Sequence, residues 1–205
     1  TSLTALKLAE IIQEADLPKG VVNIITGAGA TGAGIVNHQD IDKIAFTGST
    51  GVGKIIMKAI AGSNKKSTME LGGKAANIIF EDAPLDQAVE GVINGIYFNQ
   101  GHVCCAGSRL FVQESVYDVV LRKLKDRIQS LILGNPLDKN TDIGAINSKE
   151  QLGTINKYLK IGQQEGADMF QLDCPLPKKG FWCPPTLFTH VSQSHVIAKE
   201  EIFGP

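Results

Sequence analysis

The stretch KIAFTGSTGVGKIIMKAIAG, residues 43–62, decides the fold because its pattern changes type across a glycine turn. Residues 43–46 form a short apolar run, typical of a buried strand, and residues 52–61 have the spacing of an amphipathic helix. The turn Thr47-Gly48-Ser49-Thr50-Gly51 joins them. A strand that enters a helix through such a turn is the repeating unit of a parallel α/β sheet.

The flanking sequence continues this alternation. Upstream and downstream of the turn, we predict a helix at 3–15, a strand at 21–25, a short helix at 32–37 and a strand at 67–71. After Gly72-Gly73 the pattern restarts, with strands predicted at 76–80 and 109–113. Helices are predicted from Asp82 or Asp86 to about Phe98, at 115–131 and at 149–164. Residues 174–185 are predicted to form a loop with an edge strand. The chain is therefore predicted to be α/β, with a domain boundary at Gly72-Gly73.

The composition excludes several classes of partner. The 205 residues are 43% hydrophobic and 20% charged with a net charge of -1, which gives no reason to expect nucleic acid or a membrane as partner. The basic pairs Lys65-Lys66 and Lys178-Lys179 are predicted to be solvated turns. The four cysteines lack metal-ligand and disulfide spacing, so we expect free thiols and no metal. A start at Thr1 and an end at Pro205 lead us to expect a piece of a longer polypeptide.

The glycine turn can bind an anion. At a helix start, unpaired backbone N–H groups and the positive end of the helix dipole face outward. Gly48 lets the backbone approach a phosphate, and the Ser49 hydroxyl can donate a hydrogen bond to it. On this pattern alone, an ordinary strand–helix turn is an equally good interpretation.

A second motif is MELGGK, residues 69–74, which places Glu70 at the end of a strand that we expect to be buried. A carboxylate there is costly unless it is paired or functional. A capping or ion-paired glutamate is the alternative that the strand pattern leaves open.

The third motif contains two adjacent cysteines, Cys104 and Cys105, in GHVCCAGSR, residues 101–109. Cys104 follows a polar loop, and the small residues after Cys105 leave space for a substrate and let backbone N–H groups face a reacting carbonyl. Taken alone, a cysteine is more often a buried thiol than a nucleophile.

Together these residues resemble the aldehyde dehydrogenase superfamily, in its classical cytosolic and mitochondrial aldehyde and retinal type. The resemblance covers the whole chain and rests on four motifs in order: FTGST at 46–50, ELGGK at 70–74, FNQGHVCCAGSR at 98–109 and IAKEEIFGP at 197–205. It implies an incomplete aldehyde dehydrogenase fold. Residues 1–72 would be the C-terminal part of a Rossmann-like NAD(P)-binding domain, and residues 73–205 the N-terminal part of an α/β catalytic domain.

The resemblance assigns roles to single residues. Cys104, not Cys105, would be the nucleophile and Glu70 the general base. The expected cofactor contacts are Gly48 and Ser49 at the pyrophosphate, Leu71, Glu201 at the ribose and Phe203 beside the nicotinamide; Lys199 would order the loop. The implied cofactor is NAD, with NADP not excluded, and the substrate is a small-molecule aldehyde. The full-length parent is expected to be a homotetramer or homodimer in the cytoplasm, with the mitochondrial matrix as the alternative.

The implied chemistry is aldehyde oxidation. A Cys104 thiolate attacks the aldehyde carbon, and the N–H group of Cys104 stabilises the oxyanion of the resulting thiohemiacetal. Loss of a hydride to nicotinamide leaves a thioester, which a water activated by Glu70 hydrolyses to the acid.

Two departures from the family pattern stand out. His102 occupies a position where the family usually has Gln, and the loop Ser63–Lys66 is one residue short. The family's side-chain oxyanion Asn, its nucleotide-anchoring Lys and the acidic residue that selects NAD over NADP belong upstream of Thr1. We therefore expect the 205-residue chain alone to show no dehydrogenase turnover.

Two other functions compete. One is a catalytically silent relative with a structural, crystallin-like or binding role, against which the presence of both Cys104 and Glu70 argues. The other is a thiol hydrolase that uses Cys104 with His102, for which the sequence offers no convincing third residue to orient the histidine.

Overall fold

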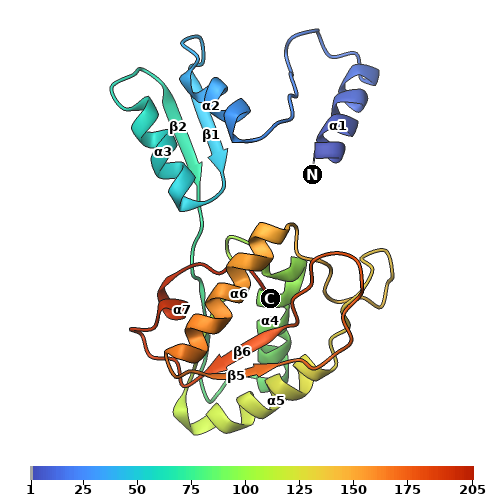
Figure 1. Ribbon diagram of the computed structural model, residues 1–205, viewed down its shortest axis with the longest axis vertical. Coiled ribbons are helices and arrows are strands. Elements are labelled where there is room, and N and C mark those ends of the chain that lie inside the picture. The colour runs from blue at the N-terminus through green and yellow to red at the C-terminus, as the bar shows by residue number, and fades with distance from the viewer. Residues whose placement is uncertain (1) are drawn as a thin grey trace. The chain divides into compact units, whose positions relative to one another are not determined.

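The computed structural model describes residues 2–205, and the chain forms two compact units that divide between Leu71 and Gly72. Figure 1 shows the elements of both units, coloured from blue at the N-terminus to red at the C-terminus. Both units combine helices with strands, and each contains a parallel strand pair, so the predicted α/β class is confirmed. The roles predicted for the two units stay predictions.

The first unit is built around a strand–helix–strand element. Its elements are α1 (Ser2–Glu14), α2 (Gly29–Asn37), β1 (Lys43–Thr47), α3 (Thr50–Ile60) and β2 (Lys66–Glu70). Strands β1 and β2 pair in parallel, with Lys43 opposite Lys66 and Thr47 opposite Glu70. Because parallel neighbours need a crossover connection, α3 spans from the end of β1 back to the start of β2.

The core of the first unit lies between α3 and the strands. Ile56 and Ile60, on one face of α3, are buried together with Ile44 of β1. Phe46 and Met69 pack against this cluster from the two strands. The spacing of four residues between Ile56 and Ile60 puts both side chains on one side of the helix, as an amphipathic helix requires.

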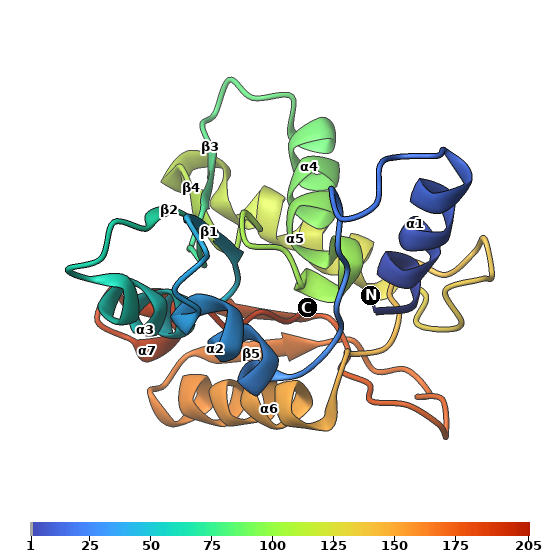
Figure 2. The same cartoon turned by 90° about the horizontal axis from the view of Figure 1, so that it is seen from above.

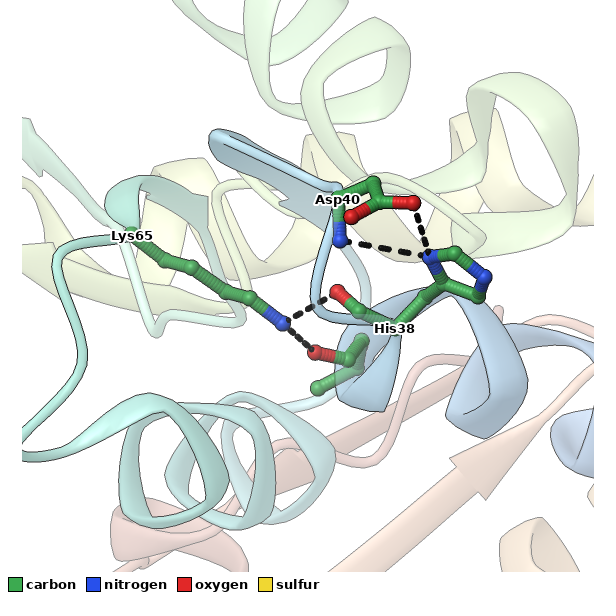
Figure 3. Close-up of polar contacts among 4 residues, drawn as sticks. His38, Asp40 and Lys65 are labelled. Carbon is green, nitrogen blue, oxygen red and sulfur yellow. Dashed lines mark hydrogen bonds and ion pairs between the residues drawn. The ribbon is translucent and has the colours of Figure 1, made fainter.

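A lysine closes the end of α2, as Figure 3 shows. The Lys65 ammonium donates hydrogen bonds to the carbonyl oxygens of Val36, at 2.6 Å, and His38, at 2.8 Å. The last carbonyls of a helix have no intrahelical donor, and a cation there also offsets the negative end of the helix dipole. Lys65 was predicted to lie in a solvated turn, but its charged group has this structural role. Next to it, Asp40 donates its backbone N–H to Nδ1 of His38 at 3.3 Å.

The second unit has two small sheets and three long helices. Its elements are β3 (Ala76–Ile79), α4 (Leu85–Tyr97), the 3-10 turn η1 (Phe98–Gly101), β4 (Arg109–Val112), the 3-10 turn η2 (Glu114–Val116), α5 (Tyr117–Gln129), α6 (Lys149–Gln164), β5 (Asp168–Gln171), β6 (Thr186–Thr189) and α7 (Val196–Lys199). Strands β3 and β4 are parallel, whereas β5 and β6 are antiparallel. Figure 2 shows α6 lying along β5.

Helices α4 and α5 enclose the main core of the second unit. Val89, Ile93 and Tyr97 of α4 are buried with Val120, Leu124 and Ile128 of α5 and with Ile79 of β3. Two ion pairs also join these helices: Lys123 to Asp86 at 2.6 Å and Arg127 to Glu90 at 2.7 Å. On each helix the charged residues are four positions apart, which places them on the same face.

Some predicted elements are absent. Residues 21–25 do not form a strand: Val21 and Ile25 are 65% and 64% exposed, and no strand in the described residues pairs with them. An apolar run becomes a strand only where a neighbour accepts its backbone hydrogen bonds. In the loop 174–185, the predicted edge strand is reduced to one bridge, between Phe181 and Ile146. Strands β5 and β6, which border this loop, were not predicted.

Candidate active site

The glycine turn in the first unit has the geometry of an anion site. The Ser49 hydroxyl oxygen accepts a hydrogen bond from the N–H of Val52 at 3.3 Å and so caps α3. Its hydrogen remains available to donate, and the N–H groups of Thr50 and Gly51 lie in the first turn of α3, where no intrahelical acceptor exists. A Cβ at Gly48 would lie 2.5 Å from the ring of Phe46, so any larger residue there would force that ring to move. These groups fit a phosphate oxygen.

Glu70 lies at the end of β2, where its carbonyl oxygen accepts the N–H of Gly48 at 3.0 Å. The strand is mostly exposed rather than buried as predicted, and the Glu70 side chain itself is exposed. In the first unit, from Ser2 onward, its carboxylate has no hydrogen-bond or ion-pair partner, so the capping and ion-pair alternatives find no support there. Leu71 packs against Gly53 of α3, where a Cβ would lie 2.5 Å from its side chain.

The cysteine loop of the second unit begins with an unusual turn. Asn99 and Gln100 have φ angles of 50° and 57° and Gly101 has 71°, so three successive residues are left-handed. Two hydrogen bonds close this turn: His102 N–H to the Asn99 carbonyl at 3.0 Å, and the Asn99 side-chain amide to the His102 carbonyl at 3.1 Å. Gln100 is fixed separately, because its side-chain oxygen accepts the N–H of Gly144 at 3.2 Å.

Cys104 and Cys105 occupy the corner of the next turn. The N–H of Ala106 donates to the carbonyl of Val103 at 3.1 Å, which leaves the two cysteines between them at the tip. Both cysteines are exposed, so neither is the buried thiol of the alternative interpretation. Within residues 72–205 the N–H of Cys104 donates no hydrogen bond, and it can therefore bind an oxyanion.

Side chains that sequence reasoning missed hold this loop in place. The amide of Asn77 on β3 donates to the Gly107 carbonyl at 3.1 Å, and a Cβ at Gly107 would collide with that amide. Arg109 donates two hydrogen bonds, at 3.1 and 2.6 Å, to the carbonyl of Lys74. The two contacts join segments 30 and 35 residues apart along the chain, so no local pattern could reveal them.

The closing segment of the chain reaches the same region. A Glu201 carboxylate oxygen accepts the N–H of Gly73 at 3.2 Å, and a Cβ at Gly73 would lie 3.5 Å from the Cys104 carbonyl oxygen. Nearby, burial lowers the pKa of Lys74; the Arg109 charge lowers it further and Glu201 partly opposes the shift. The structure therefore brings Cys104 and Glu201 to one region, on either side of Gly73.

His102 and Phe203 pack against each other, with their ring centroids 5.3 Å apart. Burial lowers the pKa of the His102 imidazole, so the neutral form is favoured. Its Nε2 atom is buried and has no hydrogen-bond partner among the described residues. No hydrogen bond joins Cys104 to either ring nitrogen of His102 within residues 72–205, so the second unit gives no support for a cysteine–histidine hydrolase.

A cavity of about 580 Å³ in the second unit lies next to the cysteine turn and the closing segment, with neither Cys104 nor Cys105 among its lining residues. Its walls include Val103 and Ala106, on either side of the two cysteines, together with Glu201 and Phe203. Apolar side chains such as Leu124 and Phe188 line other parts of the wall. A small organic molecule with an apolar part fits a cavity of this size and lining.

Other kinds of site are not found in the part of the chain that the structure describes. No group of His, Cys, Asp and Glu side chains there is arranged to hold a metal ion. No helix among these residues has both the length and the apolar character needed to cross a bilayer. All four cysteines are unpaired.

Comparison with known proteins agrees with these motifs. The family model described as "Aldehyde dehydrogenase family" matches residues 1–205. The mitochondrial aldehyde dehydrogenase of Mesocricetus auratus is 49% identical over 207 residues, covering 100% of this chain and 41% of that protein. Cytosolic aldehyde dehydrogenase 1 of Rattus norvegicus is 49% identical over 210 residues, with the same coverage of 100% and 41%.

Solved structures show the same likeness. The NAD+ complex of an aldehyde dehydrogenase from Bacillus cereus has a TM-score of 0.96 at 45% identity, covering 100% of this chain and 42% of that one. The NAD-dependent aldehyde dehydrogenase of Sinorhizobium meliloti has a TM-score of 0.96 at 38% identity, covering 100% and 41%. The chain thus spans about two fifths of the length of these relatives. With a family model matched along its whole length, the chain belongs to the aldehyde dehydrogenase family.

Proposed function

We propose that the protein containing this chain oxidises an aldehyde to a carboxylic acid with NAD or NADP, using Cys104 as nucleophile and Glu70 as general base. The observation that carries the proposal is the exposed turn of Cys104, held beside Gly73 and the Glu201 segment in a chain of this family. The substrate class is a small aldehyde, which the cavity beside Val103 can accept. Residues 1–72 supply part of the nucleotide-binding domain and residues 73–205 part of the catalytic domain.

The first step is the addition of Cys104 to the aldehyde. The thiolate forms a bond to the carbonyl carbon, and the carbonyl electron pair moves to oxygen to give a thiohemiacetal. The N–H of Cys104 has no other acceptor in the second unit and donates to that oxyanion. When the carbonyl re-forms, the C–H electron pair leaves as hydride and Cys104 holds a thioester.

Glu70 acts in the second half of the reaction. Its carboxylate is exposed and has no partner in the first unit, so it can accept a proton from water. The hydroxide equivalent adds to the thioester, the C–S bond breaks, and the Cys104 thiolate is regenerated with release of the acid.

The chain's own residues can hold the dinucleotide. Gly48 and Ser49 offer the phosphate site at the start of α3, and Leu71 follows Glu70 directly after the end of β2. Glu201 and Phe203 line the cavity and would contact the nicotinamide ribose and ring. When bound, NAD supplies the acceptor for the hydride. The solved relative from Bacillus cereus is an NAD+ complex, which supports this cofactor.

The test separates the two catalytic roles in the full-length protein. Cys104→Ala should abolish the pre-steady-state burst of NADH, because no thiohemiacetal can form. Glu70→Gln should keep the burst and slow steady-state turnover about 100-fold, the usual size of a general-base effect. Cys105→Ala, which changes the neighbouring exposed thiol, serves as the matched control and should keep both.

A wild-type protein that binds NAD but gives no burst with any small aldehyde would refute the proposal. That result would favour the second candidate, a catalytically silent relative with a structural or binding role.

A further inference from the structure

The backbone at Phe203 has an unfavourable conformation that a side chain of α6 holds in place. Phe203 has a φ angle of 58°, in the left-handed region that residues with large side chains rarely adopt. The side-chain amide of Gln151 donates to the carbonyl oxygens of both Ile202 and Phe203, each at 3.0 Å. One amide group thus fixes two successive carbonyls around the left-handed residue.

The same face of α6 makes two more contacts with this segment. Ile155, four residues after Gln151 and only 1% exposed, lies against Gly204, where a Cβ would be 2.7 Å from its side chain. Tyr158, seven residues after Gln151, donates its hydroxyl hydrogen to the Glu200 carboxylate. Residues spaced by four and seven lie on one side of a helix, so α6 presents a continuous face to the segment from Glu200 to Gly204.

Glu201 and Phe203, the two residues of this segment proposed to contact the cofactor, lie among these contacts. Glu201 is next to the residue bound by Tyr158, and Phe203 is one of the residues bound by Gln151. Both residues line the cavity, and the backbone that carries them is held by the contacts with α6. A shift of this backbone would change where the Glu201 carboxylate and the Phe203 ring point.

We infer that Gln151 and Tyr158 are positioning residues for the nicotinamide half of the dinucleotide. The α6 face holds Glu200 to Gly204 in the shape that aims Glu201 at the ribose and Phe203 at the nicotinamide ring. The inference rests on the proposed function, because it takes the ligand of Glu201 and Phe203 to be NAD or NADP.

The experiment compares NAD binding with a reaction of Cys104 that needs no NAD. Gln151→Met removes both donors at nearly constant length, and Tyr158→Phe removes only the hydroxyl. Gln164→Met is the matched control, since Gln164 is an exposed glutamine of the same helix whose side chain makes no hydrogen bond in the described residues. The dissociation constant of NAD is measured by calorimetry on the full-length protein. Hydrolysis of p-nitrophenyl acetate without NAD reports the acylation and deacylation of Cys104.

We expect the NAD dissociation constant to rise about tenfold in Gln151→Met and about threefold in Tyr158→Phe, from the loss of two and one hydrogen bonds. Ester hydrolysis should fall far less than NAD affinity in both variants, and Gln164→Met should match the wild type in both measurements.

Three results would overturn the inference. Unchanged NAD affinity in both variants would do so, with Tyr158→Phe deciding alone if Gln151→Met fails to fold. Equal losses of NAD affinity and ester hydrolysis would indicate general loosening of the unit instead of positioning. A wild type that hydrolyses the ester but neither binds NAD nor oxidises an aldehyde would refute the proposed function as well, whereas the first two results leave that function standing.

Discussion

Substitution of Gly72 by alanine should weaken cofactor binding with little loss of stability. A Cβ at Gly72 would lie 1.9 Å from a Glu201 carboxylate oxygen, whereas real Cβ atoms essentially never approach other atoms within 3.0 Å. The φ angle of Gly72 is outside the left-handed region, so alanine strains only this contact. Because the carboxylate ends a flexible side chain, it can withdraw by about 1 Å, a displacement large enough to matter for a binding group.

The magnitude follows from the hydrogen bond that the withdrawal breaks. Glu201 accepts the N–H of Gly73 at 3.2 Å, a long bond near the surface, so its loss should cost about 1 kcal/mol of folding free energy. The proposed contact of Glu201 with a ribose hydroxyl is one charged hydrogen bond; its loss, at about 1.5–3 kcal/mol, corresponds to about tenfold to hundredfold weaker NAD binding. The substitution should therefore cost more free energy in NAD binding than in folding.

The assay pairs calorimetric NAD titration with urea unfolding of the full-length protein. Gly91→Ala is the control: this glycine lies on α4, and a Cβ there would meet no atom within 4 Å, so alanine should stabilise the helix by about 0.5–1 kcal/mol and leave NAD binding unchanged. In a Glu201→Ala background, Gly72→Ala should have no further effect on NAD binding, because its target is gone. An undiminished effect in that background would refute the reasoning.

Two further predictions concern stability. Lys65→Met should destabilise the protein by about 1–2 kcal/mol, since it leaves two carbonyls at the end of α2 without their donor; Lys66→Met, at the exposed neighbour, should change urea unfolding by less than about 0.5 kcal/mol, and equal effects would contradict this role. The hydrogen bond to Glu200 raises the pKa of Tyr158 from 10.0 to about 12. Because the raised pKa belongs to the folded state, its stabilising effect should be complete below pH 10 and disappear as the pH rises to about 12. The stability difference between wild type and Tyr158→Phe, followed by thermal melts across that range, should shrink accordingly; a constant difference would contradict the assignment.

Elements with a complete local signal were predictable. The helix at 149–164 was predicted with both of its ends, since Ser148 caps its first turn through the N–H of Gln151 and the apolar spacing continues to its last turn. The turn at Gly48 and the strand–helix–strand element around it were predictable for the same reason. The prediction of a strand at 21–25 was wrong. Its apolar pattern is a local signal, whereas a strand also needs a neighbouring strand from another part of the chain.

The candidate site likewise contains residues that local motifs reveal and residues that they do not. Cys104 and Glu70 stand in motifs that can be read from adjacent residues. Gln151 and Asn77 cannot be found in this way, because each acts on a backbone carbonyl 30 or more positions away. Strands β5 and β6 were missed because each has only two apolar residues between polar ends, whereas β3 and β4, of the same length, each have three.

The left-handed turn from Asn99 to Gly101 has a consequence for chemical synthesis of the protein. Its backbone angles are the mirror image of an ordinary right-handed turn, and an L-residue such as Gln100 costs about 1–2 kcal/mol there, whereas asparagine adopts these angles more readily. A D-amino acid prefers these angles, so D-alanine at position 99 or 100 would relieve the backbone where natural side chains oppose it. Semisynthesis could then measure how much conformational energy this family member maintains directly before Cys104.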